Sequence, residues 1–210
     1  MKIVRLFIRL TPYFFRNHLF IHRPEECLQP PSLDPEYRIE FPCDVAHMTD
    51  DDLADIATDR KALHARQQQG DLFGIVSWRG QIVHRLLVQT RGMAVMEGDP
   101  RAFLLKRDEI YAHYGYTALN HRGKGILPAM LHRIITYSSE RANPCAIFAA
   151  CRRENASSAR GIQRAGFRYL KSSAILGMLS GRVRIRCWYV DTRMARVLHE
   201  ISGTGPTKQK

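Results

Sequence analysis

The sequence predicts an α/β protein in which a mixed, mostly antiparallel sheet is flanked by helices. Two observations lead to this fold class. Strand-like and helix-like patterns alternate along most of the 210 residues, 45% of which are hydrophobic, as in an ordinary globular protein. A Gly-x-Gly turn also joins a strand rich in Tyr and Ala to an apolar helix near the middle of the chain. The length suits one domain with extensions.

The expected organisation has three parts. A basic and apolar N-terminal extension ends in a Pro-rich linker (1–36), the domain itself follows (37–190), and a tail closes the chain (191–210). We expect the end of that tail to be disordered, because it is rich in Gly and Lys.

The N-terminal segment is basic. Residues 1–23 contain five Lys or Arg and no acid, and Arg5, Arg9 and Arg16 fall near one face of a helix that Pro12 would kink. Such a segment can lie on an anionic membrane surface as a peripheral contact. It can equally cover an apolar patch of its own domain or of a second copy.

The first half of the domain begins with a strand and a helix. Thr49 is a good N-cap, and the acids that follow it suit the first turn of a helix. We expect a strand at 37–48 interrupted at Pro42, a helix at 49–69, strands at 71–78 and 81–90 joined by Arg79-Gly80, and an irregular segment at 92–107.

The second half alternates strands and helices. Gly166 suits the residue after a helix, because it adopts the left-handed conformation without strain. We expect a strand at 110–119, a helix from 126, a short buried parallel strand at 146–150, a helix at 154–165, and a closing hairpin with strands at 169–179 and 183–190.

The stretch from Asn120 to Leu127 predicts a phosphate site. Gly123 and Gly125 let the backbone approach a ligand, and the following helix contributes its positive N-terminus. Arg122 and Lys124 add two charges, which together suit a phosphate or pyrophosphate. The nucleotide-hydrolase pattern fails, since Ala118 stands at its first Gly and Gly125 at its Ser or Thr. The dinucleotide fingerprint lacks its third Gly.

The same stretch resembles motif A of the GNAT acyltransferase superfamily, Arg/Gln-x-x-Gly-x-Gly/Ala. Residues 122–126 match that motif, and Leu127 departs from it. About thirty residues later, 155–158 and then 165–167 resemble the superfamily's next motif, Asn-x-x-Ser/Ala running to Gly-Phe. The resemblance covers 39–189 and implies a GNAT fold.

The resemblance implies an enzyme that moves an acyl group from acetyl-CoA, or another acyl-CoA, to the amine of a small molecule. It implies that the loop binds the pyrophosphate and that the end of the preceding strand binds the pantetheine arm through its backbone. Leu119 stands where relatives often have Pro, which a main-chain contact tolerates. The implied cofactor-binding residues are Thr117, Ala118, Leu119, Arg122, Gly123, Lys124, Gly125, Ile126, Leu127, Asn155 and Ser158.

Catalysis needs a group that removes a proton from the ammonium. Glu109 and His113 on the central strand are candidates, with His84 on the preceding strand. Many GNAT enzymes protonate the departing thiolate with a Tyr, where this chain has Ile162. Tyr116, Tyr114 or water could take that role.

The net charge of +12 is concentrated in residues 121–210, which hold seventeen Lys or Arg and four Asp or Glu. This charge favours a polyanionic ligand. It also suits an acidic acyl carrier protein as donor to a long-chain acyltransferase, and a non-catalytic acyl-CoA-binding module is a third hypothesis. No motif supports nucleic-acid binding.

The five cysteines are odd in number and contain no Cys-x-x-Cys, so we assign them no metal site and no disulfide. Reduced thiols and the lack of a signal peptide pattern lead us to expect a cytoplasmic protein.

Overall fold

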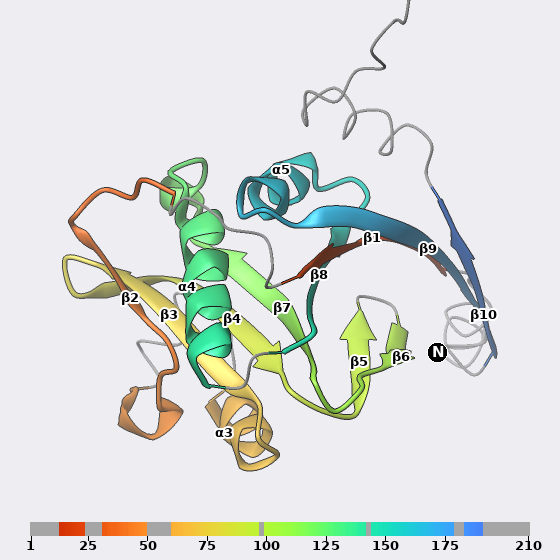
Figure 1. Ribbon diagram of the computed structural model, residues 1–210, viewed down its shortest axis with the longest axis horizontal. Coiled ribbons are helices and arrows are strands. Elements are labelled where there is room, and N and C mark those ends of the chain that lie inside the picture. The colour runs from red at the N-terminus through yellow and green to blue at the C-terminus, as the bar shows by residue number, and fades with distance from the viewer. Residues whose placement is uncertain are drawn as a thin grey trace, which may run out of the picture.

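The computed structural model describes residues 13–23, 31–49, 60–96, 99–141, 144–178 and 183–190. Its centre is an eight-stranded sheet with the order β10-β9-β1-β8-β7-β4-β3-β2 (Figure 1). All neighbouring strands are antiparallel except β7 and β8, which run parallel. The predicted mixed, mostly antiparallel sheet is confirmed.

The N-terminal segment corrects our prediction. Residues Tyr13–His22 form β1, which lies inside the sheet between β8 and β9. The expected helix is therefore wrong for these residues. The sheet also includes a strand that comes before residue 37, where we expected the domain to begin. The physical reason is an alternation that we missed: Leu19 joins the core on one face and Phe20 the core on the other. Residues 1–12 and the linker residues 24–30 lie outside the described residues.

Strands β2, β3 and β4 form one side of the sheet. They span Tyr37–Glu40, Leu72–Trp78 and Gln81–Gln89. The predicted turn joins β3 to β4, with positive φ at both Arg79 (50°) and Gly80 (88°). The expected strand at 37–48 is shorter than predicted, because the chain leaves the sheet after Glu40 and forms the 3-10 helix η1, Val45–His47.

The middle strands position the site. They are β7, Glu109–Thr117, and β8, Ala146–Arg152. The last paired residues of these two parallel strands are Ala112 and Ala149, so the strands are unpaired beyond that point. The closing strands β9, Arg168–Met178, and β10, Val183–Tyr189, pair as predicted.

Helices α4 and α5 cover one face of the sheet (Figure 1). Helix α4, Ile126–Arg141, buries Met130, Leu131 and Ile134 against strands β3, β4, β7 and β8. Helix α5, Ala156–Arg164, buries Ala159 and Ile162 in the same core. Both helices lie where the sequence analysis placed them, from residue 126 and within 154–165.

The opposite face carries helix α3, Arg60–Gln68, and a small two-stranded sheet. The sheet consists of β5, Met93–Met96, and β6, Asp99–Leu104, so the expected irregular segment at 92–107 is wrong. Ala94, Met96 and Ala102 are buried against the main sheet, which stabilises these short strands. The first part of the expected helix at 49–69 and the C-terminal tail fall on residues outside the description.

Among the described residues, none of the helices is long and apolar enough to cross a membrane. The strand at Tyr13–His22 packs between two neighbours, so these residues are committed to the sheet. Any membrane contact of the segment 1–23 would therefore fall to residues 1–12, which are not described.

Candidate functional site

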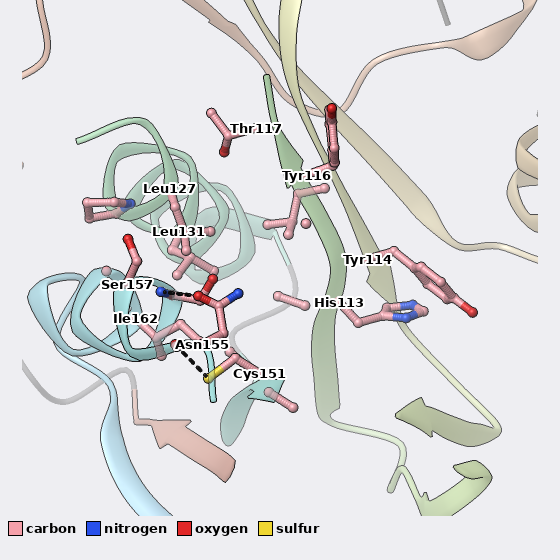
Figure 2. A pocket seen from close by; sticks show the side chains of 18 of the residues that line it. His113, Tyr114, Tyr116, Thr117, Leu127, Leu131, Cys151, Asn155, Ser157 and Ile162 are labelled. Carbon is pink, nitrogen blue, oxygen red and sulfur yellow. Dashed lines mark hydrogen bonds between the residues drawn. The ribbon is translucent and has the colours of Figure 1, made fainter. Parts of the chain in front are cut away.

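A cavity of about 1310 Å³ runs along the place where β7 and β8 part (Figure 2). Its lining includes residues from both faces of the sheet. Gly123 and Gly125 of the loop before α4 lie on the face covered by the helices, and Met96 of β5 lies on the opposite face. A volume of this size exceeds that of an ordinary small-molecule pocket and suits a large ligand together with a second molecule.

The loop before α4 is fixed at its start. Leu119–His121 form a 3-10 turn, η2. The Arg122 Nε then donates a hydrogen bond to the carbonyl oxygen of Thr117, at 3.0 Å. His121 Nδ1 lies 2.9 Å from the hydroxyl of Tyr37 on β2. These contacts attach the loop to the neighbouring strands. They lower the conformational entropy that the loop would lose when a ligand binds.

The two glycines of the loop have the left-handed conformation that glycine adopts without strain. Gly123 has φ 78° and Gly125 has φ 80°. A side chain at Gly125 would also lie 3.5 Å from the carbonyl oxygen of Ser32, whereas a Cβ at Gly123 meets no atom within 4 Å. Helix α4 begins directly after them at Ile126, so its free N–H groups face this loop.

Asn155 and Ser158 line the cavity, and Figure 2 shows Asn155 on the side of α5, near Ile162. The side-chain oxygen of Asn155 accepts a hydrogen bond from the Ser158 N–H at 3.0 Å, which caps α5. Of the predicted cofactor-binding residues, these line the cavity: Thr117, Arg122, Gly123, Gly125, Ile126, Leu127, Asn155 and Ser158. Ala118, Leu119 and Lys124 lie beside them in the chain without lining it.

Strand β7 carries a bulge at the cavity. Leu87 of β4 is opposite His113, whereas Arg85 is opposite Tyr116, so Tyr114 and Gly115 share one partner position. Tyr114 has a positive φ of 52°, and a Cβ on Gly115 would lie 2.9 Å from the side chain of Leu86. The buried guanidinium of Arg85 donates a hydrogen bond to the Tyr114 carbonyl.

Glu109 does not lie at the cavity, so the structure gives no support to it as a catalytic base. It stands at the first residue of β7 and accepts a hydrogen bond from the Lys106 N–H at 3.0 Å. The Lys106 ammonium is 3.9 Å away. The carboxylate therefore closes a turn, and the bulge that lines the cavity begins five residues further along the strand.

His113 lines the cavity, on the side of β7 away from Asn155 (Figure 2). Its ring stacks on Tyr111, with the centroids 4.9 Å apart and the planes 14° apart. Neither ring nitrogen has a hydrogen-bond partner among the described residues. Burial, with smaller effects from Arg66 and Arg85, lowers the pKa of His113 to about 3. This imidazole is neutral at pH 7 and a weak proton acceptor.

The other expected catalytic side chains also lie here. His84 Nδ1 is 2.8 Å from the hydroxyl of Thr117, and burial lowers the pKa of His84 to about 3. Tyr114 and Tyr116 line the cavity, so both phenols remain candidates for a proton donor. Ile162 of α5 lines it as well, so this position presents an apolar side chain to the cavity.

One cysteine faces the cavity from β8. Burial, helped by the nearby Glu154, raises the pKa of the Cys151 thiol to about 12. The thiol therefore stays protonated at neutral pH and is a poor nucleophile.

Sequence reasoning missed the lining residues on the face opposite α4 and α5, among them Phe15, Asn17, Met96, Tyr111 and Arg152. Two of them belong to β1, which we had predicted as a helix. Met96 belongs to β5, which we had predicted as irregular. The alternation within Tyr13–His22 was the signal that could have placed the first two.

Neither a family model nor a curated protein matches this chain. Solved structures do resemble it. The chain has the GNAT fold. An acetyltransferase from the GNAT family of Colwellia psychrerythraea superposes with a TM-score of 0.52 at 12% identity, over 91% of this chain and 62% of that one. The GCN5-related N-acetyltransferase of Sphaerobacter thermophilus gives a TM-score of 0.54 at 13% identity, over 83% and 54%.

A third GNAT structure, the GCN5-related N-acetyltransferase of Kribbella flavida, gives a TM-score of 0.53 at 10% identity, over 82% of this chain and 62% of that one. The chain thus spans between about half and two thirds of the length of these three structures. At such identities the likeness concerns the GNAT fold alone.

Proposed function

We propose that this protein transfers an acyl group from acyl-coenzyme A to the amine of a small molecule. The loop from Arg122 to Gly125 and the N-terminus of α4 would hold the pyrophosphate, since they combine a cation, two left-handed glycines and free helix N–H groups. Asn155 and Thr117 would lie along the pantetheine arm.

A single observation carries this proposal. The cavity that begins at the loop continues past the point where β7 and β8 stop pairing, and it reaches residues on the opposite face of the sheet. A long donor bound on the helix side can therefore present its thioester to a second molecule on the other side. Bringing the two reactants together in this way supplies much of the rate enhancement of a bimolecular transfer.

The reaction forms one bond and breaks one. The lone pair of the amine nitrogen attacks the thioester carbonyl carbon, the carbon–sulfur bond breaks, and coenzyme A leaves. The amine loses one proton and the sulfur takes one up, so no redox partner is needed. Because His113 and His84 are weak bases, we assign the removal of the amine proton to water in the cavity. Tyr114 or Tyr116 would protonate the sulfur.

The test is ligand binding followed by turnover. Acetyl-coenzyme A at about 100 times its Kd should raise the melting temperature by roughly 5 to 10 °C, because it binds only the folded state. Gly125→Asp should abolish this shift, since it places an anion against the pyrophosphate and a side chain at a positive φ. Thiol release in the presence of a panel of primary amines then measures transfer.

Gly80→Asp is the matched control, because Gly80 has φ 88° in a turn that is not part of the cavity. It should lower the melting temperature in a similar way and keep the full shift by acetyl-coenzyme A. A full shift in the Gly125→Asp variant, or no thiol release with any amine, would refute the proposed function.

A further inference from the structure

The part of the cavity on the face opposite α4 and α5 has its own chemistry, and we call it the acceptor chamber. Its lining includes Phe15, Asn17, Met96, Tyr111, His113 and Arg152. These residues come from four strands, β1, β5, β7 and β8, and the alternation of each strand turns them to the same face.

The walls of the chamber are apolar and aromatic. Met96 and Tyr111 belong to one buried cluster that includes Leu19 and Phe148. Tyr111 stacks on His113, and Phe15 adds a further ring from β1. Such walls favour a ligand with an apolar or aromatic body, because burying a side chain of that size contributes about 1.5 to 3 kcal/mol.

A cation lies at the rim. The guanidinium carbon of Arg152 lies 5.3 Å from the centroid of the Phe15 ring, and Arg152 is exposed while Phe15 is half-buried. Ala149 of β8 pairs with Ala112 of β7. Three residues beyond this pair stand Arg152 on β8 and Gly115 of the bulge on β7. Arg152 and the bulge therefore stand at equal offsets on the two sides of the gap between the strands. A guanidinium in this place can bind a carboxylate through two hydrogen bonds.

Two neutral polar groups lie deeper in the chamber. His113 is 5% exposed, and both of its nitrogens lack a hydrogen-bond partner among the described residues. A buried polar group without a partner is costly, so the His113 ring offers a hydrogen bond to a ligand in this chamber. Asn17, which is 2% exposed, brings a buried amide to the same lining.

The charges of the chamber agree with an acceptor that carries a carboxylate. Arg152 is the arginine that lines it, and no Asp or Glu lines it among the described residues. The other arginines of the cavity, Arg122, Arg160 and Arg164, lie in the loop before α4 and on α5, on the donor side. A polycationic amine would meet repulsion here, whereas an amine that also carries a carboxylate would be attracted.

We infer that the acceptor is an amino acid with an apolar or aromatic side chain, bound by Arg152 through its carboxylate and by the Phe15, Met96 and Tyr111 walls through its side chain. The α-amine would then face His113 and the bulge at Tyr114. A free amine donates a hydrogen bond to a neutral imidazole, which holds the nitrogen lone pair free for attack. This inference rests on the proposed function and adds the class of acceptor to it.

The test compares three amines in the full-length protein with acetyl-coenzyme A. L-Phenylalanine has the amine, the carboxylate and the apolar body; phenethylamine lacks the carboxylate; glycine lacks the body. We expect kcat/KM for L-phenylalanine to exceed that for each of the others by at least about tenfold, the ratio for 1.4 kcal/mol of lost contact. Spermidine, a polycation, should be the poorest acceptor.

Arg152→Met should lower the preference for L-phenylalanine over phenethylamine by about tenfold. Arg133→Met is the matched control, since Arg133 is exposed on α4 and does not line the cavity, and it should keep the preference of the unaltered protein. An equal or higher kcat/KM for phenethylamine, glycine or spermidine would overturn the inference, and so would an unchanged preference in Arg152→Met.

The two proposals fail in different ways. If acetyl-coenzyme A raises the melting temperature and an amine outside this class is the best acceptor, the acceptor class is wrong and the acyl transfer stands. If acetyl-coenzyme A gives no thermal shift and no amine releases thiol, both are wrong.

Discussion

The buried guanidinium of Arg85 donates a hydrogen bond to the main-chain carbonyl of Tyr114, at the bulge where β7 meets the cavity. A bulge leaves backbone groups without their ladder partners, and here a charged donor satisfies one of them. The same guanidinium lies 5.8 Å from the centroid of the Tyr116 ring. Arg85 thus connects the shape of the strand to two phenols of the site.

We expect Arg85→Met to destabilise the protein by about 1 to 3 kcal/mol, because it removes a charged donor and leaves the Tyr114 carbonyl without its partner. Acyl transfer should fall more than binding of acetyl-coenzyme A, because the cofactor loop does not depend on the bulge. Arg85→Lys should recover part of both losses. Urea unfolding, kcat and KM measure these effects.

Arg133→Met on the exposed face of α4 controls for the loss of one arginine. If Arg85→Met keeps both the unfolding free energy and kcat of the unaltered protein, the guanidinium does not hold the bulge.

The part of the cavity formed by the loop before α4 could be read from the sequence, because its residues are close together in the chain. The strand, the glycines and the helix follow one another between Glu109 and Arg141, so local patterns were sufficient. Asn155 was also predictable, since a helix cap depends on neighbouring residues.

The acceptor chamber could not be read from the sequence in this way. Phe15 and Arg152 meet only because β1 pairs with β8, and such pairing depends on contacts between residues far apart in the chain. Burial also changed the chemistry of His113, whose sequence suggested an ordinary imidazole. The polar residues Asn17, His18 and His22 of β1 are all buried, although side chains of these types are more often exposed or only partly buried.

The buried histidines make stability depend on pH. His84 and His113 have folded pKa values lowered to about 3 from 6.5, chiefly by burial. Between those values the unfolded chain binds more protons than the folded one. The free energy of unfolding is therefore not reduced by these rings above pH 6.5. It falls as the pH falls below that value, by up to about 1.4 kcal/mol per pH unit for each ring.

We therefore expect His84→Gln and His113→Gln each to reduce the loss of unfolding free energy between pH 7 and pH 5 by about 1 to 2 kcal/mol. Urea unfolding at the two pH values measures this difference. His64→Gln, which replaces an exposed histidine on α3, is the control with which the two variants are compared. Equal losses in all three variants would show that the two buried rings titrate as ordinary histidines.

The strand β1 is the feature on which the sequence and the structure differ most, and Phe20 tests it. Phe20 is 0% exposed, lies in the core under α4 and α5, and meets the Tyr169 ring edge-on at a centroid distance of 6.0 Å. Phe20→Ala should cost about 3 to 5 kcal/mol, because it leaves a cavity in a close-packed core. The exposed Arg23→Ala should change the unfolding free energy by less than about 0.5 kcal/mol.

A basic helix lying on a membrane predicts the opposite: an unchanged melt in Phe20→Ala, and flotation with anionic liposomes that salt weakens. Thermal melting and flotation at low and high salt, measured on both variants, decide between the two arrangements of residues 13–22.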